Sequence, residues 1–144
     1  MIETELRSKL RLYQVTVIFS ILFALIGFSY NVWRMEVSEQ NDTIRTASFE
    51  LLKELAELEQ IIYVAHYDSD PVEGNPRKGW VKVGLISELS PLTSKEVMDT
   101  AEALKKEWSE GWSKIDIDRA TVDGLVDAIN ISRSEIRSLL SSLE

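Results

Sequence analysis

Hydrophobic residues follow two different patterns along this chain, and the first is an apolar stretch near the N-terminus. No charged residue occurs between Arg11 and Arg34, where the sequence includes YQVTVIFSILFALIGFSYNVW. A helix rises about 1.5 Å per residue, so about 20 residues cross the roughly 30 Å hydrocarbon core of a bilayer. The pattern therefore predicts a transmembrane helix over residues 12–34, preceded by a cytoplasmic tail over residues 1–11.

The residues at the ends and on one face of this stretch fit a membrane helix. Tyr13, Tyr30 and Trp33 are predicted to lie at the membrane interface, where amphipathic aromatic rings are favoured. Ser20 and Gly27 are small and lie seven positions apart, so we expect them to share a face that another helix can approach. A cleaved signal peptide is the alternative, but an apolar stretch that continues to Trp33 favours a permanent anchor.

The basic residues beside the stretch predict its orientation. Arg7, Lys9 and Arg11 precede it, whereas Arg34 follows it and is succeeded by acidic residues. Because basic residues accumulate on the cytoplasmic side, we expect a cytoplasmic N-terminus. In a bacterium this arrangement places the chain in the inner membrane, with residues 35–144 in the periplasm.

The second pattern is an apolar seam with alternating spacings of four and three residues, which is typical of coiled coils. It consists of Val37, Asn41, Ile44, Ser48, Leu51, Leu55, Leu58, Ile62 and Ala65. Phe49, Leu52, Ala56 and Ile61 widen the seam, so several neighbouring helices are predicted to cover it. The membrane helix either continues unbroken into this segment or is interrupted at SEQNDT, with Asn41 or Asp42 capping a new helix.

Three shorter helices are predicted after the loop DSDPVEGNP. Asn75 and Pro76 are typical of a helix start, although WVKVGLI also allows a strand pair. Thr93 and Glu96 fit a capping box at the start of the next helix, and Asp116 or Asp118 fits the cap of the last one. The expected inner stripes are Trp80, Val83, Ile86 and Leu89; Val97, Ala101, Leu104, Trp108 and Trp112; and Val122, Leu125, Val126, Ile129, Ile136, Leu139, Leu140 and Leu143.

The predicted fold class is therefore all-α: one N-terminal transmembrane helix followed, over residues 35–144, by a small antiparallel helical bundle. We expect about four helices, of which the first is long and coiled-coil-like.

Composition narrows the chemistry that this domain can perform. From residue 35 onward there are 12 lysines and arginines against 22 aspartates and glutamates, a net charge of −10. Such a surface repels phosphate backbones, so nucleic acid is not an expected partner. The chain has no cysteine and a single histidine, which excludes disulfides, thiolate chemistry and multi-histidine metal sites.

One loop carries candidate metal ligands. His66, Asp68, Asp70 and Glu73 supply one nitrogen and three carboxylates within eight residues. Calcium, zinc or manganese would suit such a set, but the spacing differs from that of an EF-hand. A solvated acidic turn explains the same residues, with His66 bonding a carbonyl at a helix end. We therefore predict no cofactor and keep these four residues as candidate metal ligands.

Two further groups are candidate partner-binding residues. The basic residues Arg77, Lys78 and Lys82 form a positive island in an acidic domain and could meet an acidic partner or lipid headgroups. Ordinary charge at a helix start is the alternative. Trp80, Trp108 and Trp112 are expected to be core anchors, or binding residues wherever they are exposed.

No residues stand at a recognisable catalytic spacing, so we expect no enzymatic activity. The architecture resembles, in general terms, accessory subunits of bacterial secretion and pilus machines, division coiled-coil proteins and phage spanins. This resemblance implies a membrane-anchored interaction or scaffold protein, an accessory subunit of a bacterial inner-membrane complex. Its expected partners are the lipid bilayer and proteins in the same membrane, among them a second copy of this chain. The alternative is a periplasmic ligand-sensing bundle that signals through a partner.

Overall fold

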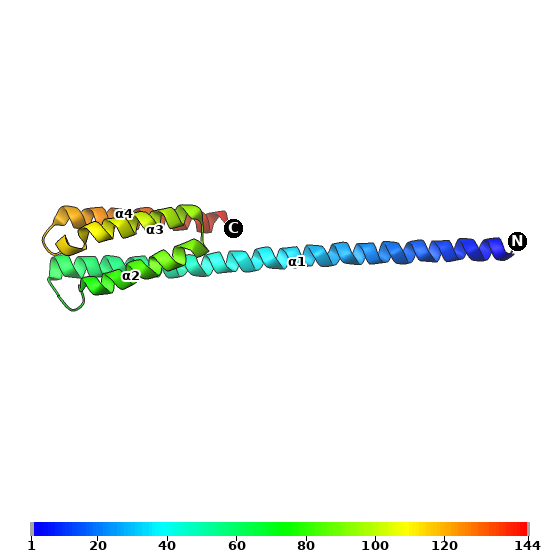
Figure 1. Ribbon diagram of the computed structural model, residues 1–144, viewed down its shortest axis with the longest axis horizontal. Helices are drawn as coiled ribbons and strands as arrows, with labels where there is room; N and C mark the ends of the chain where they lie inside the picture. Colours follow the sequence, from blue (N-terminus) through cyan, green and yellow to red (C-terminus); the bar gives the residue numbers. More distant parts are fainter. Residues whose placement is uncertain (1, 144) are drawn as a thin grey trace. The chain divides into compact units, whose positions relative to one another are not determined.

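The computed structural model describes residues 2–143, and every regular element in this range is helical (Figure 1). The α-helices are α1 (Ile2–Tyr63), α2 (Pro76–Leu89), α3 (Lys95–Gly111) and α4 (Arg119–Ser142). The shorter helical turns are η1 (Val64–Asp68), η2 (Ser90–Leu92) and η3 (Trp112–Lys114). Four helices and a long apolar first helix confirm the all-α prediction, and the strand pair considered for WVKVGLI is wrong.

Helix α1 continues without a break through the polar segment SEQNDT. Asn41 and Asp42 therefore do not cap a new helix, and that alternative is wrong. The segment contains neither glycine nor proline, so nothing in the backbone forces an end there. The described residues nevertheless fall into two compact units, divided between Gln40 and Asn41.

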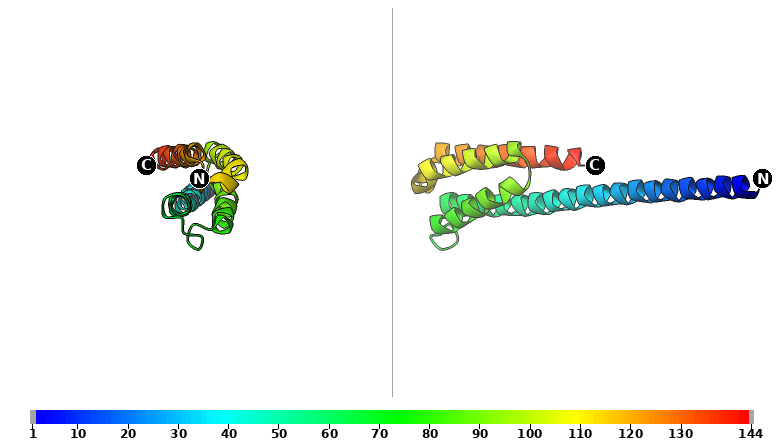
Figure 2. Two further views of the ribbon diagram at one scale, coloured as in Figure 1. Left: turned by 90° about the vertical axis from the view of Figure 1, so that its left-hand side faces the viewer. Right: turned by 45° about the vertical axis from the view of Figure 1, so that its right-hand side comes forward.

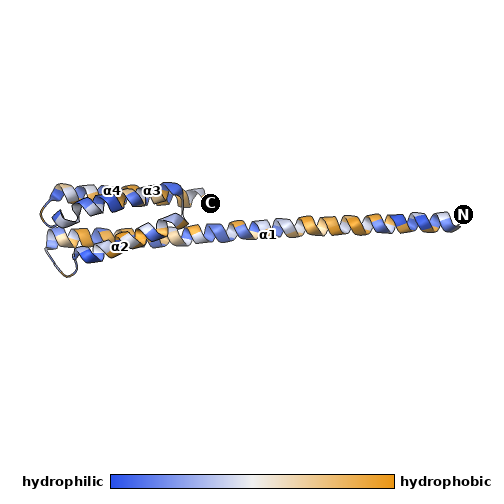
Figure 3. Ribbon diagram, in the orientation of Figure 1, coloured by the Kyte–Doolittle hydropathy of each residue, from blue (hydrophilic) through white to orange (hydrophobic). Residues whose placement is uncertain are grey.

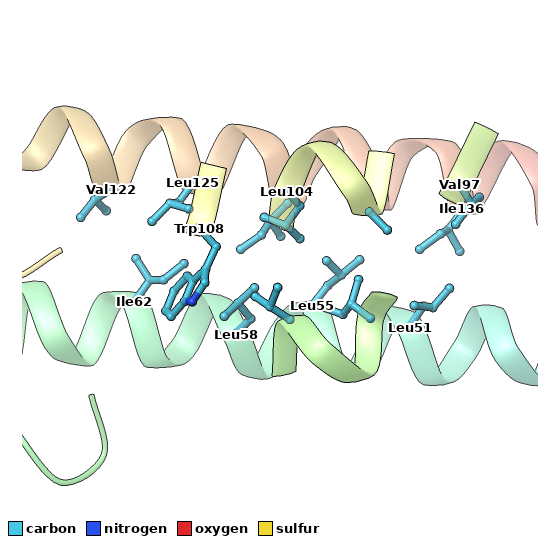
Figure 4. Close-up of a cluster of buried hydrophobic side chains, with 14 of the residues drawn as sticks. Leu51, Leu55, Leu58, Ile62, Val97, Leu104, Trp108, Val122, Leu125 and Ile136 are labelled. Atoms are coloured by element: carbon cyan, nitrogen blue, oxygen red, sulfur yellow. The ribbon is translucent and has the colours of Figure 1, made fainter. Parts of the chain in front are cut away.

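In the second unit all four helices contribute to one apolar core (Figure 4). The views in Figures 1 and 2 agree that α2 lies beside the later part of α1 and that α4 lies beside α3. The fully or almost fully buried residues include Leu51, Leu55, Leu58, Ile62, Val83, Ile86, Val97, Ala101, Leu104, Trp108, Ile115, Val122, Leu125, Ile129 and Ile136.

The predicted seam of α1 is buried in its middle, its N-terminal end is exposed, and the predicted widening is confirmed in part. Ser48 through Ile62 lie in the core at the expected positions, whereas Val37 is exposed. Of the four residues predicted to widen the seam, Ile61 is buried and Leu52 packs against the core, whereas Phe49 and Ala56 are exposed. The seam therefore serves the core of its own domain from Ser48 to Ile62, and Ala65 packs against the edge of that core.

Polar side chains cap the three shorter α-helices. Asn75 accepts a hydrogen bond from the Arg77 amide, and Asp118 accepts one from the Ala120 amide. Of the two aspartates considered for α4, Asp118 is therefore the cap. These side-chain oxygens satisfy backbone amides that have no partner within the helix.

The predicted capping box at the start of α3 is wrong by one residue. Ser94, not Thr93, has the extended N-cap backbone, and its hydroxyl accepts a hydrogen bond from the Val97 amide. The Thr93 hydroxyl instead donates to the carbonyl of Ser90, at 2.6 Å, and closes the turn η2. Two adjacent hydroxyl residues fit the same cap motif, and the preceding Ser-Pro turn decides which one is used.

Two polar contacts join α1 to α4 beside the core. Arg133 Nη2 lies 2.6 Å from Glu59 Oε2, and both side chains are mostly buried. Arg45 Nη2 donates to the carbonyl of Leu143 at 2.9 Å. These two contacts, each made by an arginine, fix the register of the two helices, since sliding either helix by one turn would break both.

Candidate functional site

The first unit contains the apolar part of α1, and every side chain from residue 3 to residue 40 is exposed. The most apolar window of α1 is long enough to cross a membrane and is wholly uncovered by the described protein (Figure 3). Leu12, Ile18, Leu22 and Phe28 are all more than half exposed, as are most of their large apolar neighbours. A monomeric soluble protein rarely leaves so much contiguous apolar surface in water.

The aromatic residues predicted for the membrane interface lie near the two ends of this apolar stretch. Tyr13, Tyr30 and Trp33 are exposed, and the rings of Tyr30 and Trp33 lie 6.1 Å apart. Their side chains are therefore available to a bilayer.

The small residues of the stretch leave one place open to another helix. The Ser20 hydroxyl donates to the carbonyl of Thr16 in its own helix, so its polarity is already satisfied. A Cβ atom added at Gly27 would meet nothing within 4 Å. The face of Ser20 and Gly27 is thus accessible, and its predicted contact with a partner helix stays a prediction.

The four candidate metal ligands do not converge. His66 Nδ1 bonds the carbonyl of Ile115 at 2.7 Å, which ties η1 to the turn after η3. Asp70 Oδ1 accepts from the amides of Val72 and Glu73. These two backbone hydrogen bonds hold the pKa of the Asp70 carboxyl below its ordinary value. Within residues 2–143 no three histidine or carboxylate side chains have metal-binding geometry.

The loop residues instead shape the chain. Glu73 forms an ion pair with Lys78 at 3.0 Å, and Asp68 is exposed. The Asp70 oxygen closes an Asx-type turn, which makes Asp70 the residue that turns the chain. The arrangement matches the turn interpretation of these residues more closely than the metal one.

The basic island is largely neutralised within the chain. Lys82 Nζ lies 2.9 Å from Glu54 Oε2 and also pairs with Glu57. The two carboxylates, Glu57 first, raise the pKa of Lys82, and the hydrogen bond from Lys82 lowers the pKa of Glu57. Lys78 is held by Glu73, so Arg77 is the member without an ion pair among the described residues. Lys82 therefore joins α2 to α1, and little of the island's positive charge is left for a partner.

The three tryptophans have different surroundings. Trp108 is fully buried, which agrees with a core anchor and leaves it no surface for a partner in this conformation. Trp80 is partly exposed and packs edge-on against Trp108, with ring centroids 6.3 Å apart. Trp112 is 40% exposed. The amide of Trp112 donates to the carbonyl of Trp108, so the two residues lie one turn apart, but the prediction that both are core anchors holds for Trp108 alone.

The structure also creates a surface feature that sequence reasoning missed. A groove of about 610 Å³ lies where the end of α1, the loop before α2 and the turn after α3 come together. Trp112 and Ile117 line it together with Pro71 and Asp116. The sequence carries one sign of it, the alternation IDID at residues 115–118. It puts two isoleucines into a segment between helices, where no core residue was expected.

Comparison with known proteins gives no family for this chain. No model of a known family matches it, no curated protein matches its sequence, and no solved structure matches its fold. Its function is therefore inferred from the features described above.

Proposed function

We propose that this chain is a non-enzymatic, single-pass membrane-anchored interaction protein. Residues 12–34 cross the bilayer, and residues 35–144 form a small antiparallel helical bundle that binds protein partners. The observation that carries the proposal is the apolar part of α1, whose large side chains are exposed over the length of a membrane span. In a bilayer these side chains contact lipid tails, so their apolar surface is removed from water.

The proposed location is a bacterial inner membrane, with the N-terminus in the cytoplasm and the bundle in the periplasm. The flanking charges Arg7, Lys9 and Arg11 support this orientation, because they outnumber the basic residues just beyond the span. The anchor confines the bundle to a plane and so raises its effective concentration for partners in the same membrane. An accessory subunit of a membrane complex makes direct use of that effect.

The membrane part of the proposal is tested by extraction of native membranes with alkaline carbonate. The full chain should stay in the pellet. A variant carrying Leu22→Lys and Ile26→Lys should move to the supernatant, since each central lysine costs about 2.5–3.5 kcal/mol on insertion. Ile131→Lys is the matched control, because Ile131 is equally exposed but lies on α4. Release of the unmodified chain by carbonate would show that it is not an integral membrane protein.

The absence of cysteine makes the orientation directly measurable. Ser8→Cys and Ser134→Cys place single thiols at exposed positions on either side of the apolar stretch. In intact cells a membrane-impermeant maleimide should label position 134 and leave position 8 unlabelled until the membrane is opened. The reverse result would invert the proposed topology.

The interaction part is tested by purification of the C-terminally tagged chain in mild detergent. A stoichiometric membrane complex is expected, and cross-linking within it should involve the exposed surface of residues 41–143. Recovery of a strict monomer without any co-purifying subunit would contradict the proposed role.

A groove between α1 and α2 favours a second candidate, a periplasmic ligand-sensing bundle that signals through a partner. It measures about 420 Å³, and the oppositely charged pairs Lys82–Glu57 and Lys78–Glu73 lie beside an apolar floor. A small zwitterionic ligand suits such a mixture of charges. Thermal stabilisation of the full chain by a member of an amino-acid panel would favour sensing, and a flat panel would exclude ligands of that class.

A further inference from the structure

The groove at the end of the second unit is built from three segments that are distant in sequence. Ser69 follows η1, Pro71 and Asn75 belong to the loop before α2, and Trp112 and Ile117 flank the turn after α3. Its volume of about 610 Å³ is in the range of sites that hold one or two side chains of a ligand.

Hydrogen bonds within the chain hold all three walls in place. Asp70 Oδ1 accepts the amides of Val72 and Glu73, which fixes the loop before α2. His66 Nδ1 bonds the carbonyl of Ile115, which joins the end of α1 to the turn after α3. The amides of Ile117 and Asp118 both donate to the carbonyl of Lys114, at 3.1 and 2.8 Å. The groove is thus formed before anything binds, which lowers the entropic cost of binding.

Two large apolar side chains on the groove take no part in the core. Ile117 is 80% exposed, more than any other large apolar residue among those described, and Trp112 is 40% exposed. Ile115, two positions earlier, is only 2% exposed and fills the core. The turn therefore buries one isoleucine and holds the other out beside a tryptophan, a residue type that dominates binding hot spots.

The charge of the groove has one sign. Of the described residues that line it, two are ionisable, and both are aspartates, Asp70 and Asp116. The carboxylate of Asp116 is exposed and makes no hydrogen bond within residues 2–143, and Asp70 uses Oδ1 alone for its backbone contacts. The domain around them carries a net charge of −10. An occupant with positive charge is therefore favoured over an acidic one.

We propose that this groove binds an extended segment of a protein partner in which an apolar side chain stands next to lysine or arginine. The apolar side chain packs between Trp112 and Ile117, and the basic side chain pairs with Asp116. This inference rests on the proposed role as an interaction protein and names the chemistry of the partner segment.

The test uses the full chain in nanodiscs of zwitterionic lipid, labelled with ¹³C at the isoleucine methyl groups. Three octapeptides are titrated: GSKLKFSG, its acidic counterpart GSELEFSG and its polar counterpart GSKSKSSG, with empty nanodiscs as background. The methyl group of Ile117 should shift with the first peptide, while that of Ile131 on α4 should not. We expect GSKLKFSG to bind at least about tenfold more tightly than either counterpart.

Substitutions at exposed positions test the assignment without threatening the fold. Ile117→Ser should weaken binding of GSKLKFSG about tenfold and Asp116→Asn about threefold, while the matched controls Ile131→Ser and Asp127→Asn leave it unchanged. Equal binding of the basic and acidic peptides, or shifts that avoid Ile117, would overturn the proposal. So would the absence of binding to the unmodified chain. Carbonate extraction and co-purification are unaffected by these outcomes, so failure of the groove is distinguishable from failure of the proposed function.

Discussion

The close contact between α2 and α3 allows a quantitative test of the core. Gly79 packs against the indole of Trp108, and a Cβ atom at position 79 would overlap Cη2 and Cζ2 of that ring and lie 3.2 Å from Cζ3. The ring is fully buried, so it cannot swing out into solvent to avoid the added atom. Gly79→Ala therefore forces a shift of packed atoms, which costs about 1–3 kcal/mol in a well-packed core.

Gly84 supplies the matched control in the same helix. A Cβ atom at Gly84 would meet nothing within 4 Å, so Gly84→Ala should gain only the helix preference of alanine, about 0.8–1 kcal/mol. The same gain applies at Gly79, so it cancels when the two variants are compared. The free energy of unfolding of Gly79→Ala should accordingly be lower than that of Gly84→Ala by about 1–3 kcal/mol.

The assay is urea unfolding of the full chain in mild detergent, followed by the loss of helical circular dichroism, a signal that does not depend on Trp108. A double-mutant cycle with Trp108→Phe isolates the contact, because phenylalanine lacks the outer indole ring atoms that meet position 79. The indole Nε1 has no hydrogen-bond partner among the described residues, so this substitution removes no hydrogen bond. A coupling of about 0.5–3 kcal/mol is expected. Equal stabilities for Gly79→Ala and Gly84→Ala, or a coupling near zero, would refute the described packing of α2 on α3.

Three further predictions concern the polar contacts of the second unit. Lys82→Ala leaves the carboxylate of Glu54, whose side chain is only 8% exposed, without its ion-pair partner. It should lower the free energy of unfolding by about 1–3 kcal/mol in the same urea assay. The control Lys53→Ala removes an exposed ion pair and should change that free energy by less than about 0.5 kcal/mol. Ser94→Ala should cost about 1 kcal/mol by thermal unfolding, and Ser94→Asp, which keeps the cap acceptor, should restore it; equal losses would contradict the cap. The pKa of Glu57 is lower in the folded chain than its ordinary 4.5, so this carboxylate contributes stability above pH 4.5 that is lost as the pH falls through the folded pKa. In an acid titration followed by circular dichroism, Glu57→Gln should therefore lose less stability over this pH range than the unmodified chain.

Part of the fold could be predicted because it depends on local spacing. The buried positions of α3, from Val97 to Trp108, recur at intervals of four, three and four, and each was expected in the core. The helix from Pro76 follows from a proline preceded by asparagine, a combination that begins helices on local grounds. Such signals need no knowledge of distant residues.

The candidate site was less predictable because its residues meet only after folding. Lys82 looked like free positive charge until the folded chain placed it beside Glu54 and Glu57 on α1. His66 was compatible with a metal site or with a hydrogen bond to a carbonyl, and the carbonyl that it bonds belongs to Ile115, 49 residues later. Charge and ligand chemistry in a sequence describe what a side chain can do, and the partner that it meets decides what it does.

The helical class, the apolar stretch of α1 and the central seam from Ser48 to Ile62 could be predicted before any fold was known, because they depend on residue type and periodicity along one element. The packing of the folded chain was needed to show which of Trp108 and Trp112 is buried, which hydroxyl caps α3 and where the groove beside Ile117 lies. Each of these depends on where one helix ends relative to another. A shift of a single residue at a helix end turns a side chain by about 100°, and that is enough to exchange a core position for a surface one.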